Sequence, residues 1–343
     1  MKAVTIRDVA KLANTSKSTV SRYLNGIEVR KDTKESIERV IKEIDFHRNI
    51  NARRLVTHNT FTLGIVVEEI SNNYYTNIFK GIEKIANEKG FTCVFYSWSS
   101  DIKDEKSYLR IIPEGQVDGL ILITFNKRSQ DLLKEIKTID APIVVVGDTG
   151  DFDDLLSVDI DNYFGISEAV RHLYSGGHRK VAYISGPKDI AATNIRLQSF
   201  KETMMELGMD MDESWIVDSE WTNESGYKAM MNLLPIGGFT AVLASNDETA
   251  IGAIKAMRDE GLNLPEDISI IGFDDIPVAS WVYPALTTVK QPFYEIGTEA
   301  AELLFSRIES KGSTVQKKSF VKPKLIIRES SKLLSEISDK SAL

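Results

Sequence analysis

The stretch VTIRDVAKLANTSKSTVSRYLNG, residues 4–26, predicts two short helices joined by a tight turn. Thr5 and Asp8 stand in the positions of a capping box at the start of the first helix. Asn14 opens a three-residue turn, since Asn tolerates the left-handed backbone that a sharp connection between helices often requires. A second helix follows over residues 17–24. This pattern is typical of a helix-turn-helix unit.

The second helix has an apolar side and a polar, basic side, because residues one, four, five and eight steps along it return to one face. Lys17 and Ser18 stand at its N-terminal end, where they would meet base edges in a DNA major groove. Side-chain hydroxyls and the backbone amides at the start of a helix can donate hydrogen bonds to phosphate oxygens. The candidate DNA contacts of this unit are Thr5, Ser16, Lys17, Ser18, Ser21, Arg22 and Asn25. A small helical bundle with a basic face is the alternative interpretation.

A third helix completes this N-terminal head, which we place at residues 1–46. Asp32 and Glu35 predict a second capping box at the start of that helix. Ile37 and Val40 begin its buried stripe. The head is therefore expected to be a three-helix domain with its own small core.

The distribution of charge separates this head from the rest of the chain. Residues 1–60 hold 13 Lys and Arg against 7 Asp and Glu, whereas the remaining residues hold 29 against 43. A basic head on an acidic body suggests a module that binds a polyanion attached to a domain with another task.

Length and composition limit the class of protein. The 343 residues predict two or three domains, and 42% hydrophobic with 27% charged residues is ordinary for a soluble globular chain. No apolar run is long enough for a transmembrane helix, and the first residues lack a signal-peptide pattern. Cys93, the single cysteine, excludes an internal disulfide framework, so we expect a cytoplasmic protein with no membrane partner.

From Phe61 onward the pattern changes to alternating strands and helices. The strand candidates are apolar runs at residues 63–67, 92–97, 119–123, 142–147, 181–185, 240–245 and 268–273. The helical patterns lie at residues 78–89, 129–137, 165–174, 196–207, 225–234, 248–260 and 294–310. Continuous apolar strands that alternate with helices predict parallel sheets covered on both faces. Two doubly wound halves fit this number of strands, and ligands bind at the carboxyl ends of strands in such folds.

Motifs of several enzyme classes are absent from the sequence. There is no P-loop motif and no G-x-G-x-x-G after a strand. The four histidines do not have the H-E-x-x-H spacing of a zinc site. We therefore expect no enzyme, no cofactor and no metal.

The head and five later segments resemble the lactose-repressor (LacI/GalR) family of bacterial transcription regulators. The family pattern T-I-x-D-V-A-x-x-A-x-V-S-x-x-T-V-S-R-x-L-N matches residues 5–25 except in the turn, where this chain has Asn14 for the usual Gly and Thr15 for the usual Val. The later matches are NARRL at 51–55, GHRKVAYISGP at 177–187, ASNDETAIGAIKAM at 244–257, LPEDISIIGFDD at 264–275 and PALTTVKQP at 284–292. The resemblance covers nearly the whole chain in order.

The resemblance implies a hinge helix and linker at residues 47–60, which forms a helix only on DNA in the dimer. Seven residues are too few for a stable isolated helix, so partner contacts must supply the stability. Leu55 would be an apolar wedge between base steps in the minor groove. The hinge residues implied to contact DNA are Asn49, Ala52, Arg53 and Leu55. A flexible basic linker is the alternative.

For residues 61–340 the resemblance implies a periplasmic-binding-protein type I body that binds the effector and forms the dimer. The chain is expected to cross between two lobes near residues 159–162, 289–292 and 320–324. The N-lobe would comprise about 61–160 and 292–320, and the C-lobe about 161–290 and 323–340. The positions implied to line the effector site are Asn73, Tyr74, Tyr75, Asp161, Arg196, Trp221, Asn246, Asp274 and Gln291.

The chemistry of these side chains suits a polyhydroxylated ligand, because Asp, Asn and Arg hydrogen-bond hydroxyls while an aromatic ring stacks on a sugar face. We therefore expect a homodimeric, ligand-responsive regulator, a repressor of carbohydrate-utilisation genes, which binds a pseudo-palindromic operator in double-stranded DNA. The tail after Arg328 is too short for a tetramerising coil. A sugar-processing enzyme with a vestigial head and a regulator controlled by a phosphoprotein remain alternatives. The sequence leaves open whether the effector induces or co-represses.

Overall fold

The computed structural model describes residues 4–24, 26–46, 59–67, 70, 75–97, 107–123, 130–150, 152, 154–310 and 318–332. The chain divides into two compact units, residues 1–60 and residues 61–343. Several predicted site residues lie outside the described residues: Asn25, Asn49, Ala52, Arg53, Leu55, Asn73 and Tyr74.

Three helices form the head, as predicted. They are α1 (Ile6–Leu12), α2 (Lys17–Leu24) and α3 (Lys31–Glu43). Val9, Val20 and Ile37, one from each helix, are fully buried in a common core. Each helix is short, so this shared apolar contact supplies the stability that the isolated helices lack.

The start of the third helix differs from the prediction. The helix begins at Lys31, with Arg30 at the N-cap and no side-chain cap hydrogen bond. Asp32 therefore lies inside the first turn and does not form the predicted capping box with Glu35. An acidic residue there still interacts favourably with the positive end of the helix dipole.

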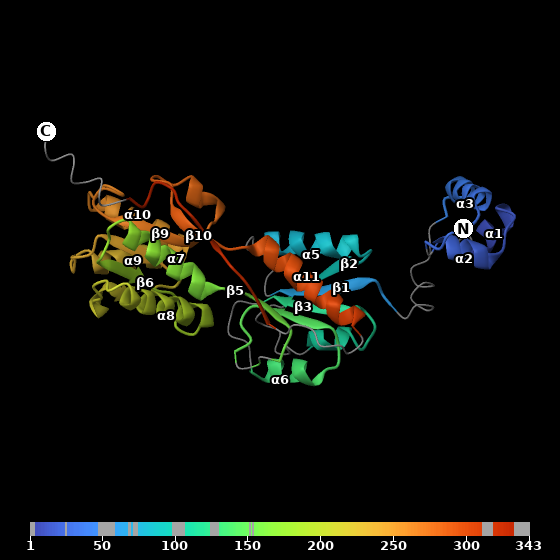
Figure 1. Ribbon diagram of the computed structural model, residues 1–343, viewed down its shortest axis with the longest axis horizontal. Helices are drawn as coiled ribbons and strands as arrows, with labels where there is room; N and C mark the ends of the chain where they lie inside the picture. Colours follow the sequence, from blue (N-terminus) through green and yellow to red (C-terminus); the bar gives the residue numbers. More distant parts are fainter. Residues whose placement is uncertain are drawn as a thin grey trace. The chain divides into compact units, whose positions relative to one another are not determined.

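The first lobe of the body is a six-stranded, entirely parallel sheet in the order β11-β5-β4-β3-β1-β2. Its strands are β1 (Thr62–Val67), β2 (Thr92–Ser97), β3 (Gly119–Ile123), β4 (Ile143–Val146), β5 (Ser157–Ile160) and β11 (Lys318–Val321). Its helices are α5 (Thr76–Glu88), η2 (Ser107–Ile111), α6 (Gln130–Thr138) and α11 (Phe293–Glu309). Figure 1 shows α5 and α11 on one side of this sheet and α6 on the other.

The second lobe repeats this architecture, with the order β12-β10-β9-β8-β6-β7 and only β12 antiparallel to its neighbour. Its strands are β6 (Val181–Ile184), β7 (Ile216–Val217), β8 (Ala241–Ala244), β9 (Ser269–Asp274), β10 (Thr287–Lys290) and β12 (Lys324–Ile326). Its helices are α7 (Asn162–Ser175), α8 (Ala191–Glu206), η3 (Glu213–Trp215), α9 (Asn223–Leu233), α10 (Asp247–Asp259) and η4 (Pro277–Ser280).

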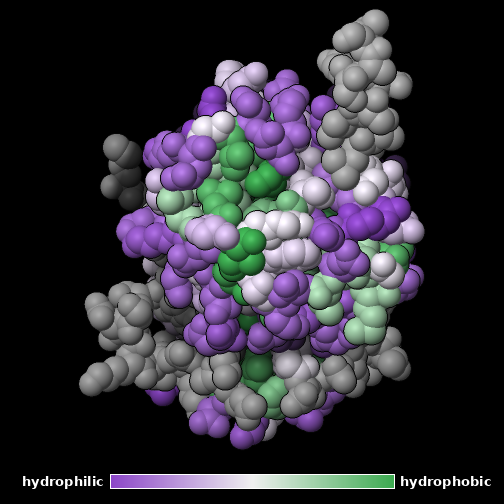
Figure 2. Space-filling view, turned by 90° about the vertical axis from the view of Figure 1, so that its left-hand side faces the viewer, coloured by the Kyte–Doolittle hydropathy of each residue, from purple (hydrophilic) through white to green (hydrophobic). Residues whose placement is uncertain are grey.

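The chain passes between the two sheets at three places (Figure 1). It leaves the first sheet after β5, returns to the first lobe after β10, and passes back from β11 to β12. Figure 2 views the molecule from the second-lobe side and shows a mainly hydrophilic surface with smaller hydrophobic areas. Within the described ranges, no helix combines the length and the apolar character needed to cross a membrane.

Two expectations about individual elements are wrong in detail. The helix predicted at 196–207 begins at Ala191 and ends at Glu206, so Arg196 lies in its second turn. Ala191 and Ala192 favour helix, which explains the earlier start. The strands without a predicted counterpart are β5, β7, β10, β11 and β12. Strands β5 and β10 carry polar residues in positions that the sheet nevertheless buries.

Candidate functional site

Hydroxyl caps fix the two helices of the predicted helix-turn-helix. The backbone amide and the hydroxyl of Thr5 donate to Asp8 Oδ2 at 2.8 and 2.7 Å. Ser16 Oγ accepts a hydrogen bond from the amide of Thr19 at 3.0 Å. Asn14 has a φ of 50°, in the left-handed region that the turn requires. The predicted capping box of Thr5 and Asp8 and the predicted turn are therefore confirmed, and Ser16 caps α2.

Helix α2 presents its polar residues outward. Val20 is fully buried, whereas Lys17, Ser18 and Arg22 are exposed and Ser21 is half-buried. Among the described residues, neither Lys17 nor Arg22 has an ion-pair partner. This face combines unpaired cations with hydroxyls, which is the chemistry needed to contact both base edges and phosphates.

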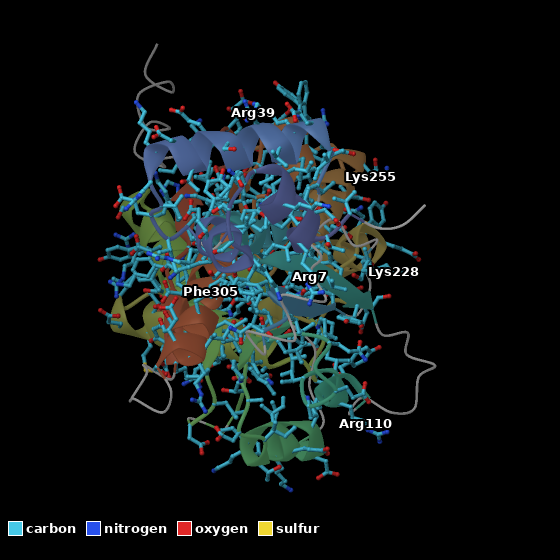
Figure 3. The ribbon with its side chains drawn as sticks, turned by 90° about the vertical axis from the view of Figure 1, so that its right-hand side faces the viewer. Arg7, Arg39, Arg110, Lys228, Lys255 and Phe305 are labelled. Carbon is cyan, nitrogen blue, oxygen red and sulfur yellow. The ribbon has the colours of Figure 1, made fainter. Side chains whose placement is uncertain are left out.

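Further cations lie on the other helices of the head. Figure 3 labels Arg7 on α1 and Arg39 on α3, and Arg39 points outward from its helix. Arg7 and Arg39 are both exposed. Their charges add to the positive electrostatic potential of the head, but they lie on α1 and α3 and not on α2.

In the body, Arg196 is the centre of a buried polar cluster. Only 4% of Arg196 is exposed. Its Nε donates to Asn162 Oδ1 at 2.8 Å, and its Nη1 donates to the backbone oxygen of Ser245 at 2.6 Å. The guanidinium lies 3.8 Å from the centre of the Phe273 ring. These contacts hold the cation rigidly where strands of the second sheet end.

Trp221 is held beside Arg196. The indole Nε1 donates to Ser245 Oγ at 2.8 Å, and the ring centre lies 5.5 Å from the Arg196 guanidinium. Gly186 allows this position, because a Cβ there would stand 2.1 Å from the indole nitrogen. Asn246 Nδ2 donates to the Trp221 backbone oxygen at 3.2 Å. The backbone of Trp221 has a φ of 57°, so several contacts fix an uncommon conformation.

Asp274 and Gln291 form the second part of the cluster. Gln291 Nε2 donates to Asp274 Oδ1, and Gln291 is only 3% exposed. The Gln291 Oε1 atom is buried without a hydrogen-bond partner among the described residues. Burial raises the pKa of Asp274 to about 7, and the Arg196 charge opposes this rise. An acceptor without a partner in such a place marks a position for a ligand or a water.

The structure gives other roles to three of the predicted effector residues. Tyr75 is buried at the start of α5, with its ring 6.1 Å from that of Phe79. Asp161 caps α7 by accepting from the amide of Phe164 at 2.9 Å. Asn246 caps α10 as well as contacting Trp221. Any contact of these residues with a ligand stays a prediction.

Sequence reasoning missed several residues of the cluster. Asn162 and Ser245 supply the oxygens that Arg196 binds, and Phe273 supplies the apolar face under it. Their positions directly after or at the end of strands were the available signal. Asp159, on β5, is 7% exposed, and burial raises the pKa of its carboxyl to about 7. We use the name Arg196 cluster for Asn162, Arg196, Trp221, Ser245, Asn246, Phe273, Asp274 and Gln291.

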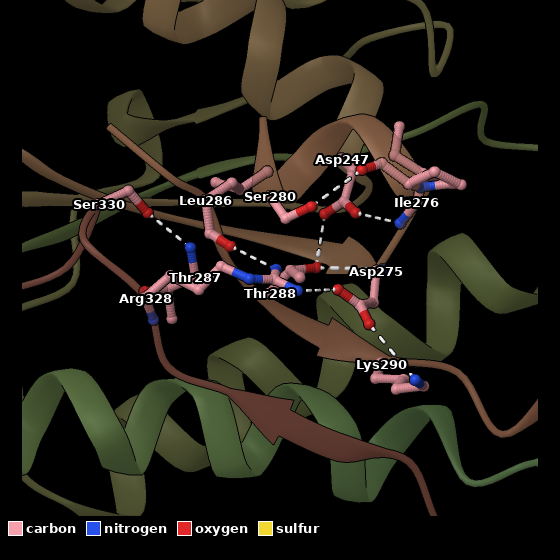
Figure 4. A network of polar contacts seen from close by, with 11 residues as sticks. Asp247, Asp275, Ile276, Ser280, Leu286, Thr287, Thr288, Lys290, Arg328 and Ser330 are labelled. Atoms are coloured by element: carbon pink, nitrogen blue, oxygen red, sulfur yellow. Dashed lines mark hydrogen bonds and ion pairs between the residues drawn. The ribbon is translucent and has the colours of Figure 1, made fainter. Parts of the chain in front are cut away.

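A polar network supports the loop that follows Asp274 (Figure 4). The fully buried Asp247 accepts from Thr288 Oγ1 at 2.5 Å and from the amide of Ile276 at 2.9 Å. Burial raises the pKa of Asp247 to about 6. Asp275 binds Arg328 Nη2 at 2.5 Å. The network joins α10, β10 and the C-terminal segment, and it fixes the backbone at Asp275 and Ile276, the two residues that follow Asp274.

Comparisons with known proteins bear on both units. The family profile described as bacterial regulatory proteins, lacI family, matches residues 5–49. The profile of a periplasmic binding protein-like domain matches residues 170–331. The HTH-type transcriptional regulator RegA of Clostridium saccharobutylicum is 36% identical over 313 residues, which cover 90% of this chain and 94% of that protein.

Two solved structures extend the similarity to the fold. A complex of the transcriptional regulator CelR with cellobiose has a TM-score of 0.71 and 30% identity, and the match covers 96% of this chain and 100% of that one. The lac repressor dimer bound to operator and the anti-inducer ONPF has a TM-score of 0.81 and 25% identity, with the same coverage of 96% and 100%. Both matches include the head and the two-lobed body.

Proposed function

Since the chain belongs to the lacI family of bacterial regulatory proteins, we propose that this transcriptional regulator is a sugar-responsive repressor which binds a pseudo-palindromic operator as a homodimer. The family consists of DNA-binding regulators, so the alternative of a sugar-processing enzyme falls away. The regulated genes would serve carbohydrate use. The proposal has a DNA-binding part and an effector-binding part.

The DNA-binding part rests on the exposed face of α2. Lys17 and Ser18 stand at the N-terminal end of that helix, which would enter the major groove. Ser16, Thr5 and Ser21 would contact phosphates or hold the helices that do. In a dimer the two recognition helices would occupy successive major grooves, as expected for a palindromic site. The hinge residues Asn49, Ala52, Arg53 and Leu55 lie outside the described residues, and their minor-groove role is part of this proposal.

The effector-binding part rests on the Arg196 cluster, and one observation carries it. Gln291 Oε1 is buried and unpartnered beside Asp274, while Arg196 and Trp221 are held rigidly nearby. A ligand hydroxyl would satisfy the Gln291 oxygen, and an aromatic ring next to a cation suits a sugar ring. The structural similarity to a regulator in complex with cellobiose supports this class of ligand.

A direct binding experiment tests both parts together. Labelled DNA from the gene's own upstream region is titrated by anisotropy against scrambled DNA at one salt concentration, with and without a panel of sugars. We expect a preference of order 10³ for the specific DNA and a shift in affinity caused by one sugar. If the protein binds the specific DNA but no sugar changes its affinity, control by a partner protein would instead be favoured.

A further inference from the structure

The backbone has an uncommon conformation at Asp274 and Asp275. Asp274 has a φ of 126° and Asp275 has a φ of 58°. Residues with a Cβ rarely adopt positive φ values, and two such residues in succession persist only where the surrounding structure holds them. Asp274 ends β9 and belongs to the Arg196 cluster. The contacts that hold this backbone therefore also determine where the Asp274 carboxyl lies.

The backbone amides that follow Asp274 are held by residues outside the Arg196 cluster. The amide of Asp275 donates to Thr288 Oγ1 at 3.4 Å, and the amide of Ile276 donates to Asp247 Oδ2 at 2.9 Å. Thr288 Oγ1 also donates to Asp247 Oδ1 at 2.5 Å, and both side chains are fully buried. These hydrogen bonds restrain the backbone on the far side of Asp274 from β9.

Arg328 holds the side chain of Asp275. Its Nη2 donates to Asp275 Oδ1 at 2.5 Å, and the two side chains are only 20% and 12% exposed. Its Nη1 donates to the backbone oxygen of Leu286 at 2.8 Å. Lys290 Nζ lies 3.6 Å from Asp275 Oδ2, but that lysine side chain is 58% exposed, so this second ion pair is weak. The Arg328 guanidinium therefore ties Asp275 to the start of β10.

The position of Arg328 is itself fixed by the C-terminal segment, residues 328–332. The amide of Arg328 donates to Thr287 Oγ1 at 2.9 Å. The fully buried Ser330 accepts from the amide of Thr287 at 2.8 Å and donates to the backbone oxygen of Ile270 at 2.6 Å. The segment is thus bonded to both β9 and β10, the strands that end beside the Arg196 cluster.

We propose that Arg328 is a positioning residue for the effector, because its ion pair with Asp275 holds the strained backbone that places the Asp274 carboxyl in the Arg196 cluster. This inference rests on the proposed function, since it concerns binding at the same cluster. It gives a role in ligand binding to the C-terminal segment, to which none of the predicted site residues belongs.

The expected effect on binding follows from the population of the strained backbone. Loss of the guanidinium removes a charge-assisted hydrogen bond and leaves the mainly buried Asp275 carboxylate without it, so fewer molecules retain the strained conformation. The apparent dissociation constant of a ligand rises by the inverse of the fraction of molecules that are competent to bind. DNA binding by the head does not require this backbone, so it should change little.

Hydrogen–deuterium exchange of the full-length, ligand-free protein tests whether Arg328 holds the backbone. In Arg328→Met we expect the amides of Asp275 and Ile276 to exchange at least about tenfold faster than in the parent, and residues 166–173 inside α7 to exchange as before. Arg179→Met is the matched control, because Arg179 also binds backbone oxygens of the second lobe, those of Tyr174 and His178. This control should leave exchange at Asp275 and Ile276 unchanged.

Titrations with glucose and with cellobiose test the link to ligand binding, with anisotropy of the labelled upstream DNA as the readout. We expect Arg328→Met to need about tenfold more sugar for half of the full effect on DNA affinity. Its DNA affinity without sugar should stay within about threefold of the parent. A general loss of stability would instead lower the melting temperature and leave the sugar concentration for half effect unchanged.

Asp275→Asn tests the same ion pair from its other side, and it serves if Arg328→Met does not fold. Asn tolerates a positive φ and retains the shape of the side chain, so this variant removes mainly the charge. If the two residues act as a pair, the variant with both substitutions should need no more sugar than either single variant. Additive losses would show that Arg328 acts through other contacts and would overturn the inference.

Two further results would contradict the inference, and a third concerns the proposed function. Unchanged exchange at Asp275 and Ile276 in Arg328→Met would show that the backbone is held without Arg328. Faster exchange with an unchanged sugar concentration for half effect would separate this backbone from effector binding. No response of the parent to either sugar would contradict the proposed response to these sugars, while the exchange experiment would still decide whether Arg328 holds the backbone.

Discussion

At the residue scale, Asp159 shows how burial changes the meaning of a sequence pattern. Ser157 and Asp159 alternate with Val158 and Ile160, which is typical of a strand with one face in water. In the structure all four residues are buried. The sequence alone therefore does not predict the burial of Asp159, because β5 lies between β4 and β11, and β11 comes from a distant part of the chain.

The buried carboxyl of Asp159 makes a prediction for stability against pH. Because the folded carboxyl retains its proton to a pH of about 7, whereas an unfolded one loses it near pH 4, its contribution to stability is greatest at low pH and falls as the pH rises through this window. An Asn side chain does not ionise in this pH range, so its burial does not make stability depend on pH. We expect Asp159→Asn to gain stability relative to the parent by about 2 kcal/mol between pH 5 and pH 7.

Denaturant unfolding of both proteins at pH 5, 6, 7 and 8 measures this difference. Asp131→Asn, at an exposed site, serves as the control and should show a much smaller change with pH. A stability difference between Asp159→Asn and the parent that stays constant over this range would show that the Asp159 carboxyl is ionised throughout.

At the element scale, apolar runs located the strands of apolar sequence, including the edge strand β2, but not the more polar strands beside the passages between the lobes. Strands β2 and β3 have the predicted bounds, since their sequences are apolar and bounded by polar turns. Strands β10 and β11 carry Thr, Lys and Ser, and pairing with distant strands determines them. The start of α3 shows the same limit, because Arg30 takes the cap position without a local side-chain signal.

Helices α5 and α11 pack closely because two glycines meet there. A Cβ on Gly297 would stand 2.1 Å from the backbone oxygen of Ile78, and a Cβ on Gly81 would stand 2.2 Å from the backbone oxygen of Tyr294. We expect Gly297→Ala to push the helices apart and to destabilise the body by about 1–3 kcal/mol.

Thermal or denaturant unfolding checks the effect of Gly297→Ala. Glu302→Ala, at an exposed position of the same helix, is the matched control and should remain within about 0.5 kcal/mol of the parent. Equal stability of Gly297→Ala and the parent would mean that the helices can separate at no cost.

The hinge supplies a prediction that concerns DNA. Leu55 lies outside the described residues, and its wedge role comes from the family resemblance. If Leu55 enters the minor groove, Leu55→Ala should weaken binding to the operator much more than binding to scrambled DNA, because only the specific complex contains the kinked step. Anisotropy on both DNAs measures this, and an equal loss on both would exclude the wedge.

At the scale of the whole molecule, the two lobes and the three passages between them place the Arg196 cluster where strands of the second sheet end. The sequence identified Arg196, Trp221 and Asp274, because each follows or lies near a strand end and matches the family. It did not identify Asn162 and Ser245, whose oxygens orient the guanidinium. Such supporting contacts depend on three-dimensional packing, so a pattern along the chain does not reveal them.

A ligand at this cluster can change DNA binding only if it binds one arrangement of the protein more tightly than another. Asn162 starts α7 directly after the chain leaves β5, so the Arg196–Asn162 hydrogen bond joins the cluster to a passage between the lobes. A ligand bound to Arg196 would act on that passage. Removal of the guanidinium should therefore abolish the response to the ligand and leave DNA binding intact.

The most direct measurement compares Arg196→Ala with the parent in anisotropy titrations of the upstream DNA. Each titration is done with and without the sugar that changes the DNA affinity of the parent. Arg171→Ala, which removes an arginine from the surface of α7, is the control. We expect Arg196→Ala to bind the specific DNA within about threefold of the parent but to lose the response to the sugar, while the control retains both. A normal sugar response in Arg196→Ala would contradict the account.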